Sequence, residues 1–317
     1  MMKKSLVALA VVAASGMAMA QSSVTLYGVA DAGIGKLPFD GAKARVTTGA
    51  ETVNNGPSRL GFTGVEDLGN GNKVGFQFET GLSLADGAPV SGGVTPETFW
   101  ARQANVFVGG GWGTIKAGRQ VTVGNIVEGV YDLTGQANYS VVDRFLQRAG
   151  TPGRADAAIA YVSPNMSGLQ AAVAYVNKNN NELIFGTRKD IWDAGVWYKN
   201  AGLAVGLSAN KILGAKTQYQ LGGKYDFGSF AVAASYHRTN INTNRRGFSL
   251  GAQAKLGAFT ATLDAVRVTK DAATGKFTSY VLEGKYALSK RTFLYADVVR
   301  DGDVKETGWG LGIHHSF

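Results

Sequence analysis

Residues Gln218–Asp226 read QYQLGGKYD, and their side chains alternate between apolar and polar. The apolar or aromatic parity holds Tyr219, Leu221 and Tyr225, and the polar parity holds Gln218, Gln220, Lys224 and Asp226. Gly247–Leu256 and Lys73–Leu82 repeat the pattern. Successive side chains of a β-strand point to opposite faces, so each segment is predicted to be a strand with one apolar and one polar face.

The same alternation recurs along the whole chain, in sixteen segments joined alternately by tight turns and by longer polar loops. Short turns at one end and long loops at the other are typical of an outer-membrane β-barrel. The soluble alternative is a large β-sandwich or solenoid, which would bury the apolar face in a core. Aromatic residues near the strand ends favour the barrel, because such residues form girdles at the membrane interfaces. They include Trp192, Trp197, Tyr198, Tyr225, Phe227, Tyr286 and Trp309.

Composition excludes several other classes of protein. The 317 residues contain no Cys, which rules out disulfides, thiolate metal sites and Cys nucleophiles. A hydrophobic content of 45% argues against a disordered chain. No uncharged apolar run after residue 20 approaches the roughly 20 residues of a transmembrane helix, which excludes a helical membrane protein. We find no linker or domain boundary, so a single all-β unit is expected.

The first twenty residues are predicted to be a signal peptide. Lys3 and Lys4 form a positive start, Leu6–Ala14 an apolar core, and Ala18–Ala20 a small-residue cleavage site. The alternative is a buried N-terminal helix. Cleavage before Gln21 would leave 30 basic and 23 acidic residues, a net charge of +7 rather than +9. The mature region is then 21–317, exported from a bacterial cytoplasm.

Several segments, in order, resemble the general porins of Gram-negative bacteria, especially the beta-proteobacterial group. They are Ser23–Ala32 (SVTLYGVADA), Ser58–Leu68 (SRLGFTGVEDL), Gly113–Gln120 (GTIKAGRQ), Ala160–Asn165 (AYVSPN), Ser289–Arg291 (SKR) and Gly312–Phe317 (GIHHSF). The resemblance implies a 16-stranded antiparallel transmembrane β-barrel, usually a homotrimer, with an inward-folded third loop. It places the chain in the outer membrane, in contact with lipopolysaccharide and outer-membrane lipids. The ending departs from the pattern, since His314 stands where Arg is usual.

The C-terminal segment is a candidate assembly signal. One parity holds Trp309, Leu311, Ile313, His315 and Phe317, so an aromatic residue ends the chain. An exposed strand edge can be captured by strand addition, and the resemblance implies recognition by the outer-membrane assembly machinery. The alternative is a last strand that simply pairs with the first; the two readings are compatible.

The connection 121–153 is too long for an ordinary loop and is therefore predicted to be functional. In the porin family that the chain resembles, the loop at this position narrows the pore and is the constriction loop. Its acidic residues are Glu128, Asp132 and Asp143, and its basic residues include Arg144 and Arg148. Asn125–Leu133 is predicted to form a short helix that packs on the barrel wall through Val127, Val130 and Tyr131. The alternative is an external flap with solvated charges.

Three arginines resemble the basic wall of a porin constriction: Arg59, Arg102 and Arg154. Arg59 is predicted to open the second strand, Arg102 to lie in the fourth, and Arg154 to open the sixth. Arg154 and Asp156 are predicted to face the lumen, opposite the parity of Ala155. The alternative places each arginine at the rim, against lipopolysaccharide phosphates.

Arginines facing loop carboxylates would create a transverse field in a narrow slot, where low-dielectric walls concentrate it. We therefore expect a water-filled channel for passive diffusion of small hydrophilic solutes and ions, with weak to moderate anion selectivity. Other predicted lumen charges are Lys73, Glu79, Lys116, Lys224, Lys255 and Lys285, with Asp31, Asp226, Asp264 and Glu283 as further acids. A substrate-specific channel or a barrel adhesin remains the alternative. Tyr131, Tyr139 and Phe145 are the aromatic residues that the loop could offer to a specific solute.

Catalysis and nucleic-acid binding have little support. The three histidines are His237, His314 and His315, and the last two point to opposite faces of one strand, so they cannot chelate one metal. Ser235 and His237 share a face but lack a placed acid. No basic stretch interleaves with aromatics as a nucleic-acid site would. No enzyme activity, metal or cofactor is expected.

Overall fold

The computed structural model describes residues 23–38, 43–49, 51–90, 98–147, 153–179, 189–239 and 244–317. The predicted signal peptide, residues 1–20, and Arg148 lie outside the described residues. Within the described part of the chain, no helix is long and apolar enough to span a bilayer.

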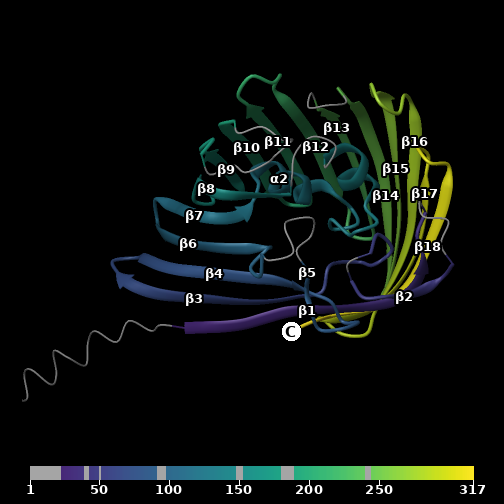
Figure 1. The fold of residues 1–317 in the computed structure, drawn as a ribbon, viewed down its shortest axis with the longest axis horizontal. Helices are drawn as coiled ribbons and strands as arrows, with labels where there is room; N and C mark the ends of the chain where they lie inside the picture. Colours follow the sequence, from purple (N-terminus) through teal and green to yellow (C-terminus); the bar gives the residue numbers. More distant parts are fainter. Residues whose placement is uncertain are drawn as a thin grey trace, which may run out of the picture.

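The described strands form one closed antiparallel sheet (Figure 1). Its eighteen strands are β1 (Ser23–Lys36), β2 (Arg45–Thr47), β3 (Arg59–Gly69), β4 (Asn72–Leu82), β5 (Pro89–Val90), β6 (Gln103–Gly110), β7 (Gly113–Val121), β8 (Arg154–Val162), β9 (Leu169–Val176), β10 (Ile191–Asn200), β11 (Leu203–Ile212), β12 (Gln218–Asp226), β13 (Phe230–Arg238), β14 (Arg246–Leu256), β15 (Phe259–Lys270), β16 (Phe277–Ala287), β17 (Thr292–Asp301) and β18 (Glu306–Ser316). The short strands β2 and β5 lie in long loops. The other sixteen form the barrel wall and run from one end of the barrel to the other; we call them the crossing strands. The predicted 16-stranded antiparallel barrel is confirmed.

The barrel closes between its first and last crossing strands. Val29–Lys36 of β1 pair with Trp309–Ser316 of β18, while Ser23–Val29 pair with β3. The terminal Phe317 exchanges two backbone hydrogen bonds of 3.1 Å with Gly28. Among the described residues, closure gives each of the sixteen long strands a neighbour on both sides, which lets their backbone groups pair within the sheet.

The predicted alternation is visible in the burial of single strands. In β13, Val232 and Tyr236 are exposed on the outer side, whereas Ala231, Ser235 and His237 are buried on the inner side. The outer side of the barrel is accordingly a belt of exposed Leu, Val, Ile and aromatic side chains. Such a belt is the surface that lipid would cover.

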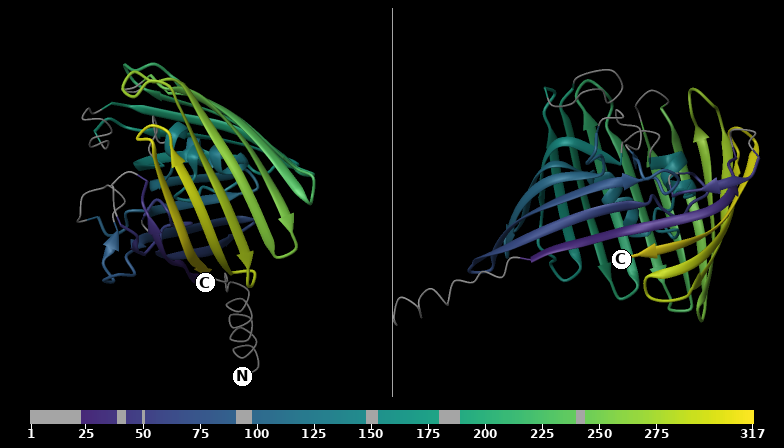
Figure 2. Two further views of the ribbon diagram at one scale, coloured as in Figure 1. Left: turned by 90° about the vertical axis from the view of Figure 1, so that its right-hand side faces the viewer. Right: turned by 60° about the horizontal axis from the view of Figure 1, so that its bottom comes forward.

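Short turns join the strands at one end of the barrel and longer loops at the other (Figure 2). The turn between β3 and β4 shows how the sequence fixes these ends. Gly69, Asn70 and Gly71 all have positive φ, which glycine adopts freely and asparagine tolerates. Asp67 accepts a hydrogen bond from the Gly69 amide and closes the turn.

We call the connection between β7 and β8 loop 3 (residues 122–153), and its described residues, 122–147 and 153, fold inside the barrel (Figure 1). It contains helix α2 (Val123–Tyr131) and a π-helical turn η1 (Asp143–Gln147). The Thr122 side chain caps α2 by accepting from the Asn125 amide. The helix predicted over Asn125–Leu133 is therefore present, beginning two residues earlier and ending two earlier.

Candidate pore constriction

Helix α2 lies on the inner faces of β10, β11 and β12. Val127, Val130 and Tyr131 are fully buried against these strands, as the helical spacing predicted. Glycines in the barrel wall leave space for these side chains. A Cβ at Gly206 would lie 2.8 Å from Val127, and one at Gly222 would lie 2.5 Å from the Tyr131 ring. Loop 3 is thus docked inside the barrel, which excludes the external flap.

Polar groups of the wall also hold α2. The Gly124 amide, in the first turn, donates to Asp193 Oδ2 of β10 at 3.2 Å. A helix leaves its first amides without internal partners, and a carboxylate suits the positive end of its dipole. At the other end, the Tyr131 hydroxyl donates to Gln220 Oε1 at 3.2 Å and lies 3.1 Å from His237 Nε2. The two ends of the helix are therefore fixed to different strands.

The loop carboxylates do not face the pore as predicted. Asp132 is 3% exposed and accepts hydrogen bonds from Thr134, Gln136 and Ser140 at 2.8–3.0 Å. Glu128 and Asp143 are also buried, at 0% and 4% exposure, and Glu128 accepts from Gln136. The prediction that these three acids face the arginines across the slot is therefore wrong, because all three are buried in the protein. The Asp132 side chain turns into loop 3, away from the water, because the backbone amides that follow α2 need a hydrogen-bond acceptor.

The three predicted arginines lie where long outer loops rejoin the barrel. Arg59 begins β3 after loop 1 (residues 37–58), and Arg154 begins β8 after loop 3. Arg102 ends loop 2 (residues 83–102), one residue before β6, so its predicted position inside the fourth strand is wrong. The sequence around Arg102 (residues 99–107, FWARQANVF) alternates poorly, and this displacement explains why. Gln103 and Asn105 pair with Glu79 and Gln77 on the inner side, and Arg102 lies outside the strand.

One buried acid joins two of these arginines. Arg102 Nε donates to Glu79 Oε1 at 2.6 Å, and Arg59 Nε lies 3.9 Å from Glu79 Oε2. Arg154 Nε donates to the Arg102 carbonyl at 2.8 Å. The side chains of Arg59 and Arg102 keep 29% and 15% exposure, so both retain contact with solvent. We call Arg59, Glu79, Arg102 and Arg154 the basic row.

A β-bulge removes Asp156 from the inner face. In register, Gly118 pairs with Ala158 and Gln120 with Ala155, so β8 holds one residue more than β7 across this interval. Ala157 takes a positive φ of 45°, and Ala155 and Ala158 are both buried. The half-exposed Asp156 lies on the other side of β8 and pairs with Arg119. The predicted inward orientation of Asp156 is therefore wrong, and the parity that predicted Arg154 to face the lumen fails with it, because Ala155 between them is the inward residue.

The remaining predicted lumen lysines lie on the polar parity of their strands. They are Lys73 of β4, Lys116 of β7, Lys224 of β12, Lys255 of β14 and Lys285 of β16. Lys255 pairs with Asp226 at 2.5 Å. Lys285 pairs with Glu283 at 2.9 Å and donates to the Thr134 carbonyl of loop 3.

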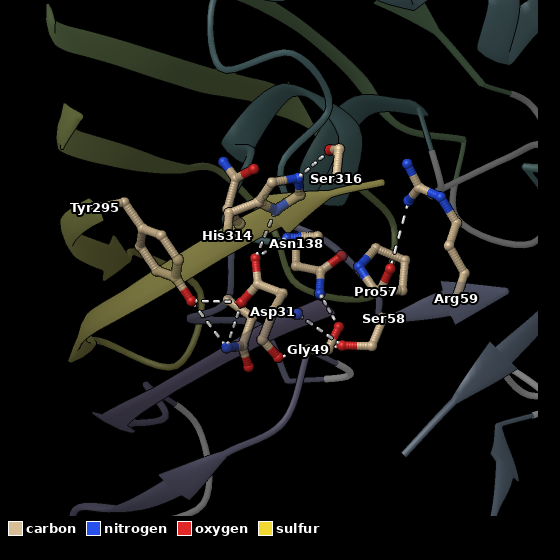
Figure 3. Close-up of polar contacts among 12 residues, drawn as sticks. Asp31, Gly49, Pro57, Ser58, Arg59, Asn138, Tyr295, His314 and Ser316 are labelled. Carbon is tan, nitrogen blue, oxygen red and sulfur yellow. Dashed lines mark hydrogen bonds and ion pairs between the residues drawn. The ribbon is translucent and has the colours of Figure 1, made fainter. Parts of the chain in front are cut away.

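A buried network that was not predicted from the sequence lies at the seam between β1 and β18 (Figure 3). Asp31 is fully buried and lies 2.9 Å from His314 Nδ1. It also accepts from the Tyr295 hydroxyl at 2.7 Å and from Asn54 at 2.9 Å. The only hint in the sequence was that His314 stands where Arg is usual in the family it resembles. The sequence did not indicate that Asp31 is its partner.

The tip of loop 3 contacts loop 1 and the wall. Asn138 donates to the Gly49 and Glu51 carbonyls at 3.0 and 3.1 Å. The Tyr139 hydroxyl accepts from Asn55 and donates to Glu283 at 2.6 Å. Burial and the charge of Glu283 raise the pKa of Tyr139 well above its usual range, so it remains a donor.

Comparison with known proteins adds the family. The family described as Gram-negative porin matches residues 6–306. The chain belongs to the Gram-negative porin family. This porin is 30% identical to outer membrane porin protein 32 of Delftia acidovorans over 364 residues, with both chains covered completely. It is 29% identical over 394 residues to an outer membrane porin protein of Bordetella pertussis, again over both full lengths.

Solved structures share the fold. An anion-selective porin from Comamonas acidovorans superposes with a TM-score of 0.76 at 24% identity, covering 94% of this porin and all of that chain. Salmonella typhi OmpF gives 0.72 at 17% identity, covering 93% and 97%. The porin is thus an outer-membrane β-barrel of a Gram-negative bacterium, and its family is one of channels rather than enzymes.

Proposed function

We propose that this porin is a water-filled channel for passive diffusion of small hydrophilic solutes and ions, with weak to moderate anion selectivity. The observation that carries the proposal is the basic row, in which Arg59 and Arg102 share the carboxylate of Glu79 and Arg154 bonds the Arg102 carbonyl. Its formal charge is +2, at the level where the outer loops enter the barrel. We also propose that residues 1–20 are a signal peptide that directs export of the chain.

The electric field at the basic row depends on the charged groups of loop 3 that lie opposite it. Because Glu128, Asp132 and Asp143 are buried within loop 3, the acidic side of the slot is weaker than a row of solvated carboxylates would be. Low-dielectric walls focus the field of the arginines and raise the local anion concentration, within a Debye length of about 8 Å at physiological salt. Lys116 and Lys224 extend the positive inner surface along the strands. The anion-selective structural neighbour supports the same sign.

A general pore fits better than a specific one. A sugar channel would present aromatic rings to the solute, but Tyr131, Tyr139 and Phe145 are buried against the wall. Their rings fix loop 3 and are not available for stacking. We keep a substrate-specific channel and a barrel adhesin as alternatives that the recording below separates.

The partners belong to the proposal as well. A homotrimer is supported by an aromatic cluster on the outer side of β3 and β4, where Trp100 of loop 2 lies 5.4 Å from Phe78 and 6.4 Å from Phe62 between ring centroids. Phe99 beside it is 52% exposed. Lipopolysaccharide and lipids would cover the rest of the belt. Exposed Leu311, Ile313 and Phe317, with Trp309, are the proposed assembly signal.

Planar-bilayer recording of the purified mature porin tests this function. In a KCl gradient we expect a reversal potential of the sign that indicates preferred chloride passage. Conductance should rise in proportion to bulk salt, and small sugars, phosphate and dicarboxylates should not block it at millimolar concentration. Saturation with salt and block by one solute would establish the substrate-specific alternative. Absence of channels would leave only the adhesin.

A further inference from the structure

Two arginines lie next to each other on the outer side of the barrel, and we call them the arginine pair. Arg238 ends β13 and Arg246 begins β14, and the two are directly opposite in the register of these neighbouring strands (Figure 1). Their neighbours His237 and Gly247 face inward, against loop 3. Because successive side chains of a strand alternate between its faces, both arginines face outward.

The charge of the arginine pair is not balanced within the described part of the chain. Like charges directly opposite each other destabilise a pair of strands. Among the described residues, no acid lies within ion-pair distance of either guanidinium, and the Nε atoms of both are buried without a hydrogen-bond partner. The connecting residues 239–245 (TNINTNR) contain no acid either. Asp271, which follows β15, is already paired with Arg245 and accepts from two backbone amides.

Two other outward-facing arginines are arranged differently. Arg267 of β15 donates to Thr278 at 2.8 Å, and Arg300 of β17 donates to Thr307 at 3.1 Å, in each case on the neighbouring strand. In register they are opposite Phe, Tyr or Thr residues and not another base. Each is a single arginine bonded to a hydroxyl group, so the juxtaposition of two bases is particular to the arginine pair.

Further donors lie beside the pair, and acceptors are lacking. Tyr219 of β12 is opposite Arg238, and Lys270 of β15 is opposite Arg246. Among the described residues of β12 to β18, the acids share the inward parity, so none faces outward. This outer surface therefore suits an anion, and it offers no carboxylate to which a divalent cation could bridge that anion.

The location of the pair favours a lipid over a dissolved anion. Both arginines lie where β13 and β14 meet a longer loop, which is the extracellular end of an outer-membrane barrel. Toward the other end, the outward parity continues with the exposed side chains of Tyr236, Phe248 and Leu250. An amphipathic lipid satisfies both regions, whereas dissolved phosphate contacts only the first. These strands lie across the barrel from β3 and β4, where the subunit contact is proposed, so lipid can reach them.

We propose that Arg238 and Arg246 bind one phosphate group of a lipopolysaccharide molecule in the outer leaflet, directly and without a bridging metal ion. Two planar guanidinium groups present paired N–H donors to the phosphate oxygens, and the bound negative charge removes the repulsion between them. The acyl chains of the same molecule lie on the apolar side chains of β13 and β14. The inference deepens the contact with lipopolysaccharide that is part of the proposed function, and it rests on that contact.

Binding of fluorescently labelled lipopolysaccharide to the detergent-solubilised porin tests the pair, with the double variant Arg238→Gln and Arg246→Gln. The matched control, Arg267→Gln with Arg300→Gln, removes the same two charges from the same outer side. Because the pair makes charged hydrogen bonds to the phosphate, we expect the Kd to rise at least about tenfold in the double variant and less than about twofold in the control. Dephosphorylated lipopolysaccharide should bind the wild type as weakly as the double variant binds the intact lipid, and EDTA should not change wild-type binding.

Four results would overturn the proposal. An equal loss in the control would show that only the net charge of the outer side matters, and a loss in EDTA would show that a cation bridges the contact. Displacement of the lipid by millimolar inorganic phosphate would assign the pair to a dissolved anion. Equally tight binding of phosphatidylglycerol would assign it to anionic lipids in general.

Two further measurements keep this proposal separate from the channel function. Heat-modifiable mobility on electrophoresis confirms that the variants compared are folded. Planar-bilayer recording of the wild type tests the channel itself, and absence of channels contradicts the channel function alone. A folded double variant that binds lipopolysaccharide as tightly as a channel-forming wild type overturns the role of the arginine pair.

Discussion

Changing Arg59, Arg102 and Arg154 together to Ala is expected to reduce or reverse anion selectivity. Each unit charge interacts with an ion at 4 Å by about 1 kcal/mol even in bulk water. Removing all three while Glu79 remains changes the formal charge of the row from +2 to −1. We expect the chloride-to-potassium permeability ratio to fall about five- to tenfold, after allowance for screening. Reversal potentials in a KCl gradient give this ratio directly.

Two single variants provide the controls. Arg267→Ala removes an exposed arginine from the outer side of β15, where it bonds Thr278 away from the basic row, so selectivity should stay unchanged. Glu79→Gln releases both Arg59 and Arg102 from their shared acid, so it should shift the ratio toward chloride. An unchanged reversal potential in the triple variant would contradict the constriction assignment.

The second large effect is expected from loosening α2. In the double variant Val127→Ala and Tyr131→Ala, the helix loses two fully buried side chains and the hydrogen bond to Gln220. Truncation of a buried aromatic alone costs about 3–5 kcal/mol. Much of that cost falls on loop docking, because the sixteen crossing strands keep their pairing. We expect the pore to widen and the mean conductance to rise by about half or more.

Single-channel conductance and vesicle swelling with sugars of increasing size measure the change. Leu207→Ala on β11 is the matched control, because it lies beside Gly206 but is 46% exposed on the outer side. Its conductance and size limit should equal those of the wild type. A double variant that folds yet keeps the wild-type conductance would show that α2 does not narrow the pore.

Most of the fold could be predicted from the sequence, because one physical rule operates along the whole chain. Each crossing strand separates lipid from water, so its alternation of apolar and polar side chains can be recognised even in single segments such as Gln218–Asp226. The position and buried face of α2 were also predictable, since Val127, Val130 and Tyr131 follow helical spacing. Loop length alone indicated that the segment had a special role.

The errors in the site have local causes that a single sequence does not display. One extra residue in β8 moves Asp156 outward, and a bulge leaves no clear signature in an alanine-rich strand. Asp132 was read as a pore charge, but the amides of its own loop use both carboxylate oxygens. Asp31 and His314 lie 283 residues apart, and only closure of the barrel brings them together.

Thiol accessibility tests the central claim most directly, namely that polar strand faces enclose water while apolar faces meet lipid. The chain has no Cys, so Lys224→Cys and Leu221→Cys on β12 can be compared without background. In a bilayer, a charged, membrane-impermeant thiol reagent should reduce the current through the Lys224→Cys channel and leave Leu221→Cys unaffected. Modification of Leu221→Cys with no effect on Lys224→Cys would contradict the account.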